Sequence, residues 1–247
     1  MTEFAHDKVV PFKTSEKTKK EQVAEMFDRI AFRYDFLNRF LSAGIDISWR
    51  KKTLLQLRDI QPKTILDVAT GTADVAIMAA KLLKPEKIIG IDISDKMLEL
   101  GKEKLLKTGL NAVIELQSGD SEAINFPDRS FDAVTVAFGV RNFEHLEKGL
   151  SEIYRVLKPG GKLAVLEFSK PKTKGIQQLY NLYMGMVAPE VGRWLSKNKD
   201  AYQYLNNSVQ QFPEGNEFSD ILKSTGFSDT SCKRLSFGIC SIYCGTK

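Results

Sequence analysis

Two aspartates, Asp67 and Asp92, stand at or near the ends of short apolar segments, and a small-residue turn follows the first of them. In an open parallel sheet the ligand lies at the carboxyl ends of the strands, so we expect both carboxylates at one site. Gly71 lets the turn backbone approach that ligand closely, and a helix that opens at Asp74 offers free N–H donors. An acid about 20 residues beyond the first turn accepts hydrogen bonds from ribose hydroxyls, the role predicted for Asp92.

The turn has the wrong composition for a dinucleotide. Such sites use the pattern G-x-G-x-x-G to receive a pyrophosphate, whereas residues 69–73 read "ATGTA" and are flanked by Asp67 and Asp74. Carboxylates repel phosphate but suit a ligand that carries an ammonium and a sulfonium group. The sequence therefore predicts S-adenosylmethionine as the cofactor.

Asp120 and Ser121 form a further polar pair, which follows another short apolar segment. A carboxylate acceptor and a backbone N–H at this point could read the edge of an adenine. A structural alternative stays open, since aspartate is also typical of an Asx turn. Asp92 has an alternative of the same kind as a helix N-cap, although Ser94 or Asp95 could take that place.

Alternating strands and helices must position these side chains. We expect strands at 63–68, 87–92, 112–117, 131–137 and 162–168, with helices at 74–83, 95–107 and 144–157. Such alternation predicts a parallel sheet. The sequence "PGG" at 159–161 is a turn signal before the fifth strand.

Further helices are expected before and after this unit. One spans Ser15 to about Leu41, a short one follows Asp46, and residues 174–209 look helical with breaks at Pro189 and Gly192. A helix at about 215–225 and a hairpin of strands 227–234 and 237–245 close the chain. We expect one domain, divided into an N-terminal helical arm and cap (1–58), a cofactor-binding core (59–170) and a helical insertion with the terminal hairpin (171–247).

The composition is that of an ordinary soluble globular protein, with 43% hydrophobic and 27% charged residues in 247. No apolar run reaches the roughly 20 residues of a membrane span, and no signal peptide is evident, so a cytoplasmic location is the default expectation. The net charge of +5 is mild, and the lysines are scattered. This disfavours nucleic acid as a partner and leaves solvated surface or peripheral contact with an anionic membrane as alternatives. Three cysteines and two histidines without metal-ligand spacing predict no metal site.

Three segments together carry a family resemblance: "YDFLNRFLSAGIDISW" (34–49), "FGVRN" (138–142) and "RVLKPGGKLAVLEFS" (155–169). They closely resemble the ubiquinone/menaquinone biosynthesis C-methyltransferase family, and the likeness runs from about residue 21 to the C-terminus. The resemblance implies an α/β fold of class I, the seven-stranded, Rossmann-like architecture of S-adenosylmethionine-dependent methyltransferases, with an N-terminal helical extension. The chain departs from the family at Asp46, where His is usual, and at Ala137, where some members have Ser.

The resemblance also implies roles for the polar residues. It puts Asp67 and Thr72 near the methionine part of the cofactor beside Gly71, Asp92 at the ribose, and Asp120 and Ser121 at the adenine. The implied reaction is C-methylation of demethylmenaquinol to menaquinol, and the alternative acceptor is a prenylated methoxy-benzoquinol.

For the acceptor, three residues are candidates. Arg141 could steady the phenolate of the reduced quinol, Asn142 could hydrogen-bond one quinol oxygen, and Tyr34 could donate to the other or relay a proton. The alternatives are that Arg141 forms a surface ion pair with Glu144 or Glu147, and that Tyr34 is core. Candidate walls for the isoprenoid tail are Phe32, Phe36 and Phe40 and the segment with Tyr180, Tyr183, Met184 and Met186, with plain helix packing as the alternative.

Two other classes of function remain open at this point. One is a methyltransferase of the same fold with another small molecule or an RNA as acceptor, since fold alone does not fix the acceptor. The other is a non-catalytic module that keeps the cofactor site. The oligomeric state is open too, with a homodimer among the options.

Overall fold

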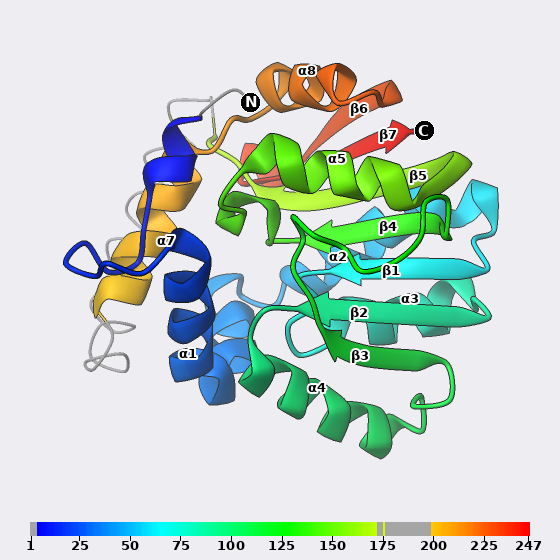
Figure 1. Cartoon of the computed structure of the whole chain (residues 1–247), viewed down its shortest axis with the longest axis horizontal. Coiled ribbons are helices and arrows are strands. Elements are labelled where there is room, and N and C mark those ends of the chain that lie inside the picture. The colour runs from blue at the N-terminus through cyan, green and yellow to red at the C-terminus, as the bar shows by residue number, and fades with distance from the viewer. Residues whose placement is uncertain (1–3, 172–174, 176–198) are drawn as a thin grey trace.

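The computed structural model describes residues 4–171, 175 and 199–247 and is built around a seven-stranded sheet of order β3-β2-β1-β4-β5-β7-β6 (Figure 1). The strands are β1 (Thr64–Val68), β2 (Lys87–Asp92), β3 (Ile114–Ser118), β4 (Phe131–Ala137), β5 (Leu157–Phe168), β6 (Ser228–Leu235) and β7 (Cys240–Thr246). The first five pair in parallel, whereas β7 is antiparallel to both β5 and β6. The predicted parallel sheet with a terminal antiparallel hairpin is confirmed.

The helices connect these strands largely as predicted. They are α1 (Lys19–Leu41), α2 (Asp46–Leu54), α3 (Asp74–Leu83), α4 (Asp95–Thr108), α5 (Leu146–Val156), α7 (Lys199–Gln211) and α8 (Asn216–Ser224), with short 3-10 turns η1 (Ala5–Lys8), η2 (Leu55–Ile60), η3 (Val140–Asn142) and η4 (Ser236–Gly238). Of the predicted helix at 174–209, only the part in α7 can be compared, and Pro189, Gly192 and the Tyr/Met segment at 180–186 lie outside the described residues.

Three boundaries differ from the prediction for identifiable reasons, one of them at β7, which begins at Cys240 rather than 237 because the 3-10 turn η4 comes before it. Helix α1 begins at Lys19 rather than Ser15, because Thr18 and Glu21 form a reciprocal capping box at that point. Strand β5 begins at Leu157 rather than 162, because Leu157 already pairs with Phe131 and the register then shifts. The "PGG" sequence therefore forms an irregularity inside β5 instead of a turn before it.

Side chains of alternate strand residues build one core on each face of the sheet. Leu66 and Val68 face the cluster that includes α5 and α8, whereas Ile65 faces the cluster formed with α2, η2, α3 and α4. Trp49 belongs to the second cluster, is 3% exposed and donates through Nε1 to Ser236 Oγ at 2.8 Å. Trp49 is therefore a packing residue of this core.

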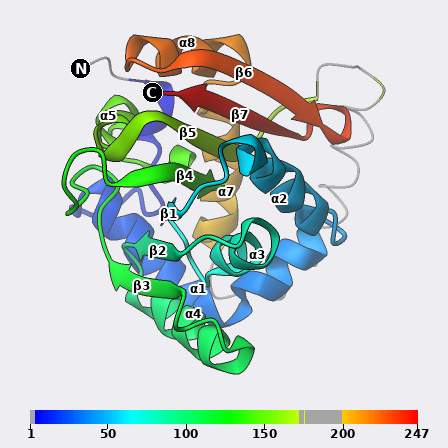
Figure 2. The same ribbon diagram turned by 90° about the vertical axis from the view of Figure 1, so that its right-hand side faces the viewer.

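The carboxyl ends of β1 to β4 all point to the side of the molecule where α1 and α7 lie (Figure 1). Figure 2 shows the same arrangement after a quarter turn, with α1 and α7 on the far side of the strands. Acids at the ends of separate strands therefore meet at one edge, as the sequence predicted. Among the described residues, no helix is long and apolar enough to cross a membrane.

Candidate active site

A cavity of about 650 Å³, including its open mouth, lies at this edge of the sheet under α1. Six of the predicted site residues line it: Tyr34, Gly71, Asp92, Asp120, Ser121 and Asn142. A smaller cavity of about 350 Å³ adjoins it across Tyr34, Gly71 and Phe138, and its walls include Asp67 and Thr72. The structure thus places eight of the nine predicted residues on two adjoining cavities, and Arg141 lines neither of them.

Asp92 ends β2 with both carboxylate oxygens facing backbone donors. Its Oδ2 accepts from Gly71 N at 2.7 Å, and its Oδ1 accepts from Ser94 N at 2.9 Å. Burial raises the pKa of Asp92 to about 6, against the lowering effect of these hydrogen bonds. Each oxygen keeps a second lone pair, so a ribose hydroxyl can still donate to it. Ser94 caps α4 in its place, which removes the N-cap alternative for Asp92.

Asp67 and Thr72 are buried at the smaller cavity, and both are already hydrogen-bonded. The two oxygens of Asp67 accept from Thr70 Oγ1 at 2.6 Å and Thr135 Oγ1 at 2.5 Å, and burial raises its pKa to about 6. Thr72 Oγ1 donates to Asp35 Oδ1 at 2.6 Å. Both hydrogen-bond partners of the Asp67 carboxylate are neutral hydroxyls, so a cationic ligand group beside it would stabilise its charged form.

The opposite end of the main cavity holds Asp120 and Ser121. Asp120 Oδ1 accepts from Glu122 N at 2.9 Å, which is the hydrogen bond of an Asx turn. Its Oδ2 forms an ion pair with Lys20 of α1. Lys20 also lines the cavity. The carboxylate is therefore both a turn-former and part of the wall.

Non-glycine residues in left-handed backbone conformations shape the loops around the cavity. Ala69, Ala73 and Phe138 have φ values of 54°, 66° and 58°. Such conformations cost on the order of 1–3 kcal/mol each and persist where the surrounding structure enforces them, which is typical of functional sites. Phe138 is in this conformation, and its carbonyl oxygen accepts hydrogen bonds from Arg141 Nη1 at 2.7 Å and from Asn142 Nδ2 at 3.3 Å.

Arg141 is a buried residue directly behind that wall. Only 5% of it is exposed, and its Nη1 donates to Glu167 Oε1 at 2.7 Å. Glu167 is fully buried at the end of β5, and burial raises its pKa against the opposing effect of Arg141. The alternative of a surface ion pair with Glu144 or Glu147 is therefore wrong.

The other two acceptor-side candidates reach the cavity itself. Asn142 Oδ1 accepts from the hydroxyl of Tyr204 at 3.1 Å, and Tyr204 on α7 is 2% exposed. Tyr34 lines both cavities, its ring lies edge-on to Phe27, and burial raises the pKa of its phenol, which keeps it a hydrogen-bond donor. Tyr34 is thus a wall residue as well as a helix-packing residue.

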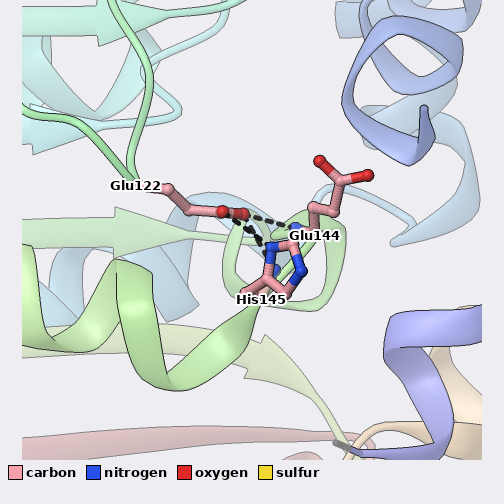
Figure 3. Close-up of side chains that lie close together, drawn as sticks. All are labelled: Glu122, Glu144 and His145. Carbon is pink, nitrogen blue, oxygen red and sulfur yellow. Dashed lines mark hydrogen bonds and ion pairs between the residues drawn. The ribbon is translucent and has the colours of Figure 1, made fainter. Parts of the chain in front are cut away.

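A group of potential metal ligands lies at the rim, where atoms of Glu122, Glu144 and His145 come within 4.8 Å of one another (Figure 3). Hydrogen bonds among these three residues account for their close approach. Glu122 Oε1 accepts from the backbone N of both Glu144 and His145 at 2.8 Å, and Oε2 contacts His145 Nδ1 at 3.0 Å. The group ties the loop before α5 to the loop after β3.

Several residues of the site were not anticipated from the sequence. Glu167 carried a usable signal, because it is an acid at the end of an apolar strand like Asp67 and Asp92. No local sequence pattern indicated Lys20, Tyr204 or Arg50, since each lies on a helix whose position over the sheet is set by tertiary packing.

A seven-stranded sheet of this order, with cavities at the carboxyl ends of its parallel strands lined by Asp92 and Asp67, is the architecture of a class I S-adenosylmethionine-dependent methyltransferase. A family model, the ubiE/COQ5 methyltransferase family, matches residues 15–247. The chain is 46% identical to the demethylmenaquinone methyltransferase of Bacteroides fragilis over 99% of both chains. It is also 46% identical to the ubiquinone/menaquinone biosynthesis C-methyltransferase UbiE of Geotalea daltonii, over 96% of this chain and all of that one. The chain belongs to the ubiE/COQ5 methyltransferase family.

A solved structure supports the fold assignment at lower identity. A putative S-adenosylmethionine-dependent methyltransferase from Methanococcus maripaludis superposes with a TM-score of 0.60 at 20% identity, over 96% of this chain and 97% of that one. The expected fold class is confirmed.

Proposed function

We propose that this chain transfers a methyl group from S-adenosylmethionine to a ring carbon of demethylmenaquinol, forming menaquinol. The observation that carries the proposal is one cavity whose wall includes the acids Asp92 and Asp120 together with Tyr34 and Asn142. The names of near-full-length relatives, at 41–46% identity, support the acceptor. Because other relatives are named for ubiquinone as well, the prenylated methoxy-benzoquinol is the second candidate.

The cofactor supplies an activated methyl group bound to a sulfonium. The chain must then align the acceptor carbon with that methyl, which can contribute several kcal/mol. In this proposal Asn142 and Tyr34 bind the two quinol oxygens from the cavity wall. Arg141 adds positive charge from just behind that wall and stabilises the phenolate. The ring proton passes to water after the new carbon–carbon bond forms, with Tyr34 as a candidate relay.

We also propose that α1 meets the membrane in which a prenylated acceptor would reside. Phe32, Phe36 and Phe40 recur at helical spacing and are 90%, 52% and 45% exposed, with the rings of Phe36 and Phe40 stacked on each other. None of the three lines either cavity described above. The same helix lines the cavity through Phe27 and Tyr34. A helix with an exposed aromatic face suits an interfacial position.

The test of the function is methyl transfer by the purified chain to a prenylated demethylnaphthoquinol under reducing, anaerobic conditions. We expect a product methylated once on the ring, seen by mass spectrometry with isotope-labelled cofactor. The prenylated methoxy-benzoquinol is assayed in parallel. Faster transfer to the benzoquinol would reassign the acceptor, and transfer to neither would overturn the proposal.

Replacement of Asp92 by alanine is expected to weaken binding of S-adenosylmethionine by roughly 2–3 kcal/mol, because the ribose hydroxyls lose a charged acceptor. Isothermal calorimetry on the folded variant measures this. Asp132→Ala is a suitable control, since Asp132 is also an acid on the sheet but binds Lys158 and the start of β1 away from the cavity. Unchanged affinity in Asp92→Ala would remove Asp92 from the site.

Replacement of Tyr204 by phenylalanine is expected to lower kcat by about fivefold at unchanged cofactor affinity. The Tyr204 hydroxyl and the Phe138 carbonyl together hold the Asn142 amide in one orientation, and loss of one such bond is worth roughly 1 kcal/mol. Tyr243→Phe is the matched control, because that buried hydroxyl accepts from Gly215 N instead. Steady-state kinetics of both variants decide, and an equal kcat in the two would contradict the role of Tyr204.

A further inference from the structure

Arg50 is a buried cation in the wall of the smaller cavity, and part of it has no partner. It lies on α2, is 5% exposed and shares the cavity wall with Asp67 and Tyr34. Its Nη1 lies 2.9 Å from Asp46 Oδ2 and donates to Asp74 Oδ2 at 2.9 Å. Both contacts are made by Nη1, whereas Nε is buried and has no acceptor among the described residues. Buried donors without acceptors are uncommon and call for an explanation.

The surrounding charges hold the guanidinium in place without using its remaining donors. Arg39 contacts the same two acids, through Nη1 to Asp46 at 3.0 Å and Nη2 to Asp74 at 3.2 Å. Lys104 contacts Asp74 at 2.8 Å and Asp35 at 2.5 Å. Three cations therefore balance three carboxylates, so a ligand that meets Arg50 does not have to displace an existing pair.

The methionine end of S-adenosylmethionine carries two charged groups, an ammonium and a carboxylate. Asp67 in the same cavity suits the ammonium, but a carboxylate needs donors and a positive charge. The edge of a guanidinium presents two parallel N–H groups that match a carboxylate. We propose that Arg50 binds the carboxylate of the methionine part of the cofactor through its Nε edge.

This proposal concerns only the cofactor and does not depend on the identity of the methyl acceptor. It predicts that Arg50 recognises the carboxylate of the cofactor, and an analogue that differs from the cofactor only at this carboxylate can test it. Decarboxylated S-adenosylmethionine keeps the adenosine, the sulfonium and the ammonium but lacks the carboxylate. Its affinity can be compared with that of the intact cofactor by calorimetry, with and without the Arg50 side chain.

The parent protein is expected to bind S-adenosylmethionine about thirtyfold or more tightly than the decarboxylated analogue, the size of effect seen for a desolvated charge pair. Arg50→Gln is expected to lose most of this preference and to bind the analogue as the parent does. Asp46 keeps Arg39 and Ser42 as partners in this variant, which limits the cost to folding.

Arg39→Gln is the matched control, because Arg39 contacts the same acids but lines neither cavity. It should keep the preference for the intact cofactor. Equal affinity of the parent for the two ligands would overturn the proposal without any variant. A preference that survives in folded Arg50→Gln, or an equal loss for both ligands, would also overturn it, since a purely structural role affects both ligands alike.

Discussion

Arg141→Ala is expected to lower the turnover of methyl transfer by on the order of a hundredfold or more, with cofactor affinity nearly unchanged. The reason is that a positive charge beside the acceptor end of the cavity stabilises the phenolate that forms during transfer. Arg141 lies behind Asn142 and Phe138 rather than on the cofactor side. Steady-state kinetics and calorimetry measure the two quantities separately.

The same substitution should also destabilise the fold, and a second variant separates the two effects. Removal of one partner from a buried ion pair costs about 3–5 kcal/mol, because Glu167 would remain buried without its cation. In the double variant Arg141→Met, Glu167→Gln, both charges of this ion pair are removed. We expect it to regain thermal stability but not turnover. Recovery of turnover in that variant would show that the charge of Arg141 is not used in the transfer.

Methyl transfer is expected with demethylmenaquinol and only at the uncatalysed background with demethylmenaquinone. The methyl donor is an electrophile, so the acceptor carbon must be electron-rich, as in a quinol that loses a proton near Arg141. The sequence contains no C-x-x-C and no G-x-G-x-x-G, so the chain is not expected to reduce the quinone itself. Anaerobic assays with and without a chemical reductant measure the difference.

Two controls accompany this assay. The rate with reductant should fall at low pH, because protonation suppresses the phenolate. Cofactor binding is measured at each pH so that titration of Asp92, with a pKa of about 6, is not mistaken for an effect on the acceptor. Equal rates with quinol and quinone would contradict the phenolate mechanism.

Local sequence patterns were sufficient to predict the sheet and the cofactor half of the site. Asp67, Gly71 and Asp92 are positioned by short-range rules, since a strand, a tight turn and a helix start fix where these residues lie relative to the sheet edge. The strand and helix boundaries in this region agree with the prediction to within two residues. The irregularity in β5 does not follow from the local pattern: Leu157 pairs with Phe131 and Lys162 with Ala133, so Pro159 and Gly160 lie between two paired residues rather than before the strand.

The acceptor half depended on contacts that local patterns do not encode. The partner of Arg141 was expected among nearby acids in the sequence, yet it is Glu167, 26 residues away on the neighbouring strand. Tyr204 contacts Asn142 from 62 residues away. Such pairs become visible only when the order of strands and the packing of helices over them are known.

The pairing of Arg141 with Glu167 has a consequence for how these two positions can change during evolution. Neither residue can be replaced alone by an uncharged one without leaving an uncompensated charge in the interior, so such a single-step intermediate is destabilised. We therefore expect descendants of one ancestor to retain both charges or to lose both. A survey of natural variation would reveal this as a coupled pattern between the two positions, even in lineages whose methyl acceptor has diverged.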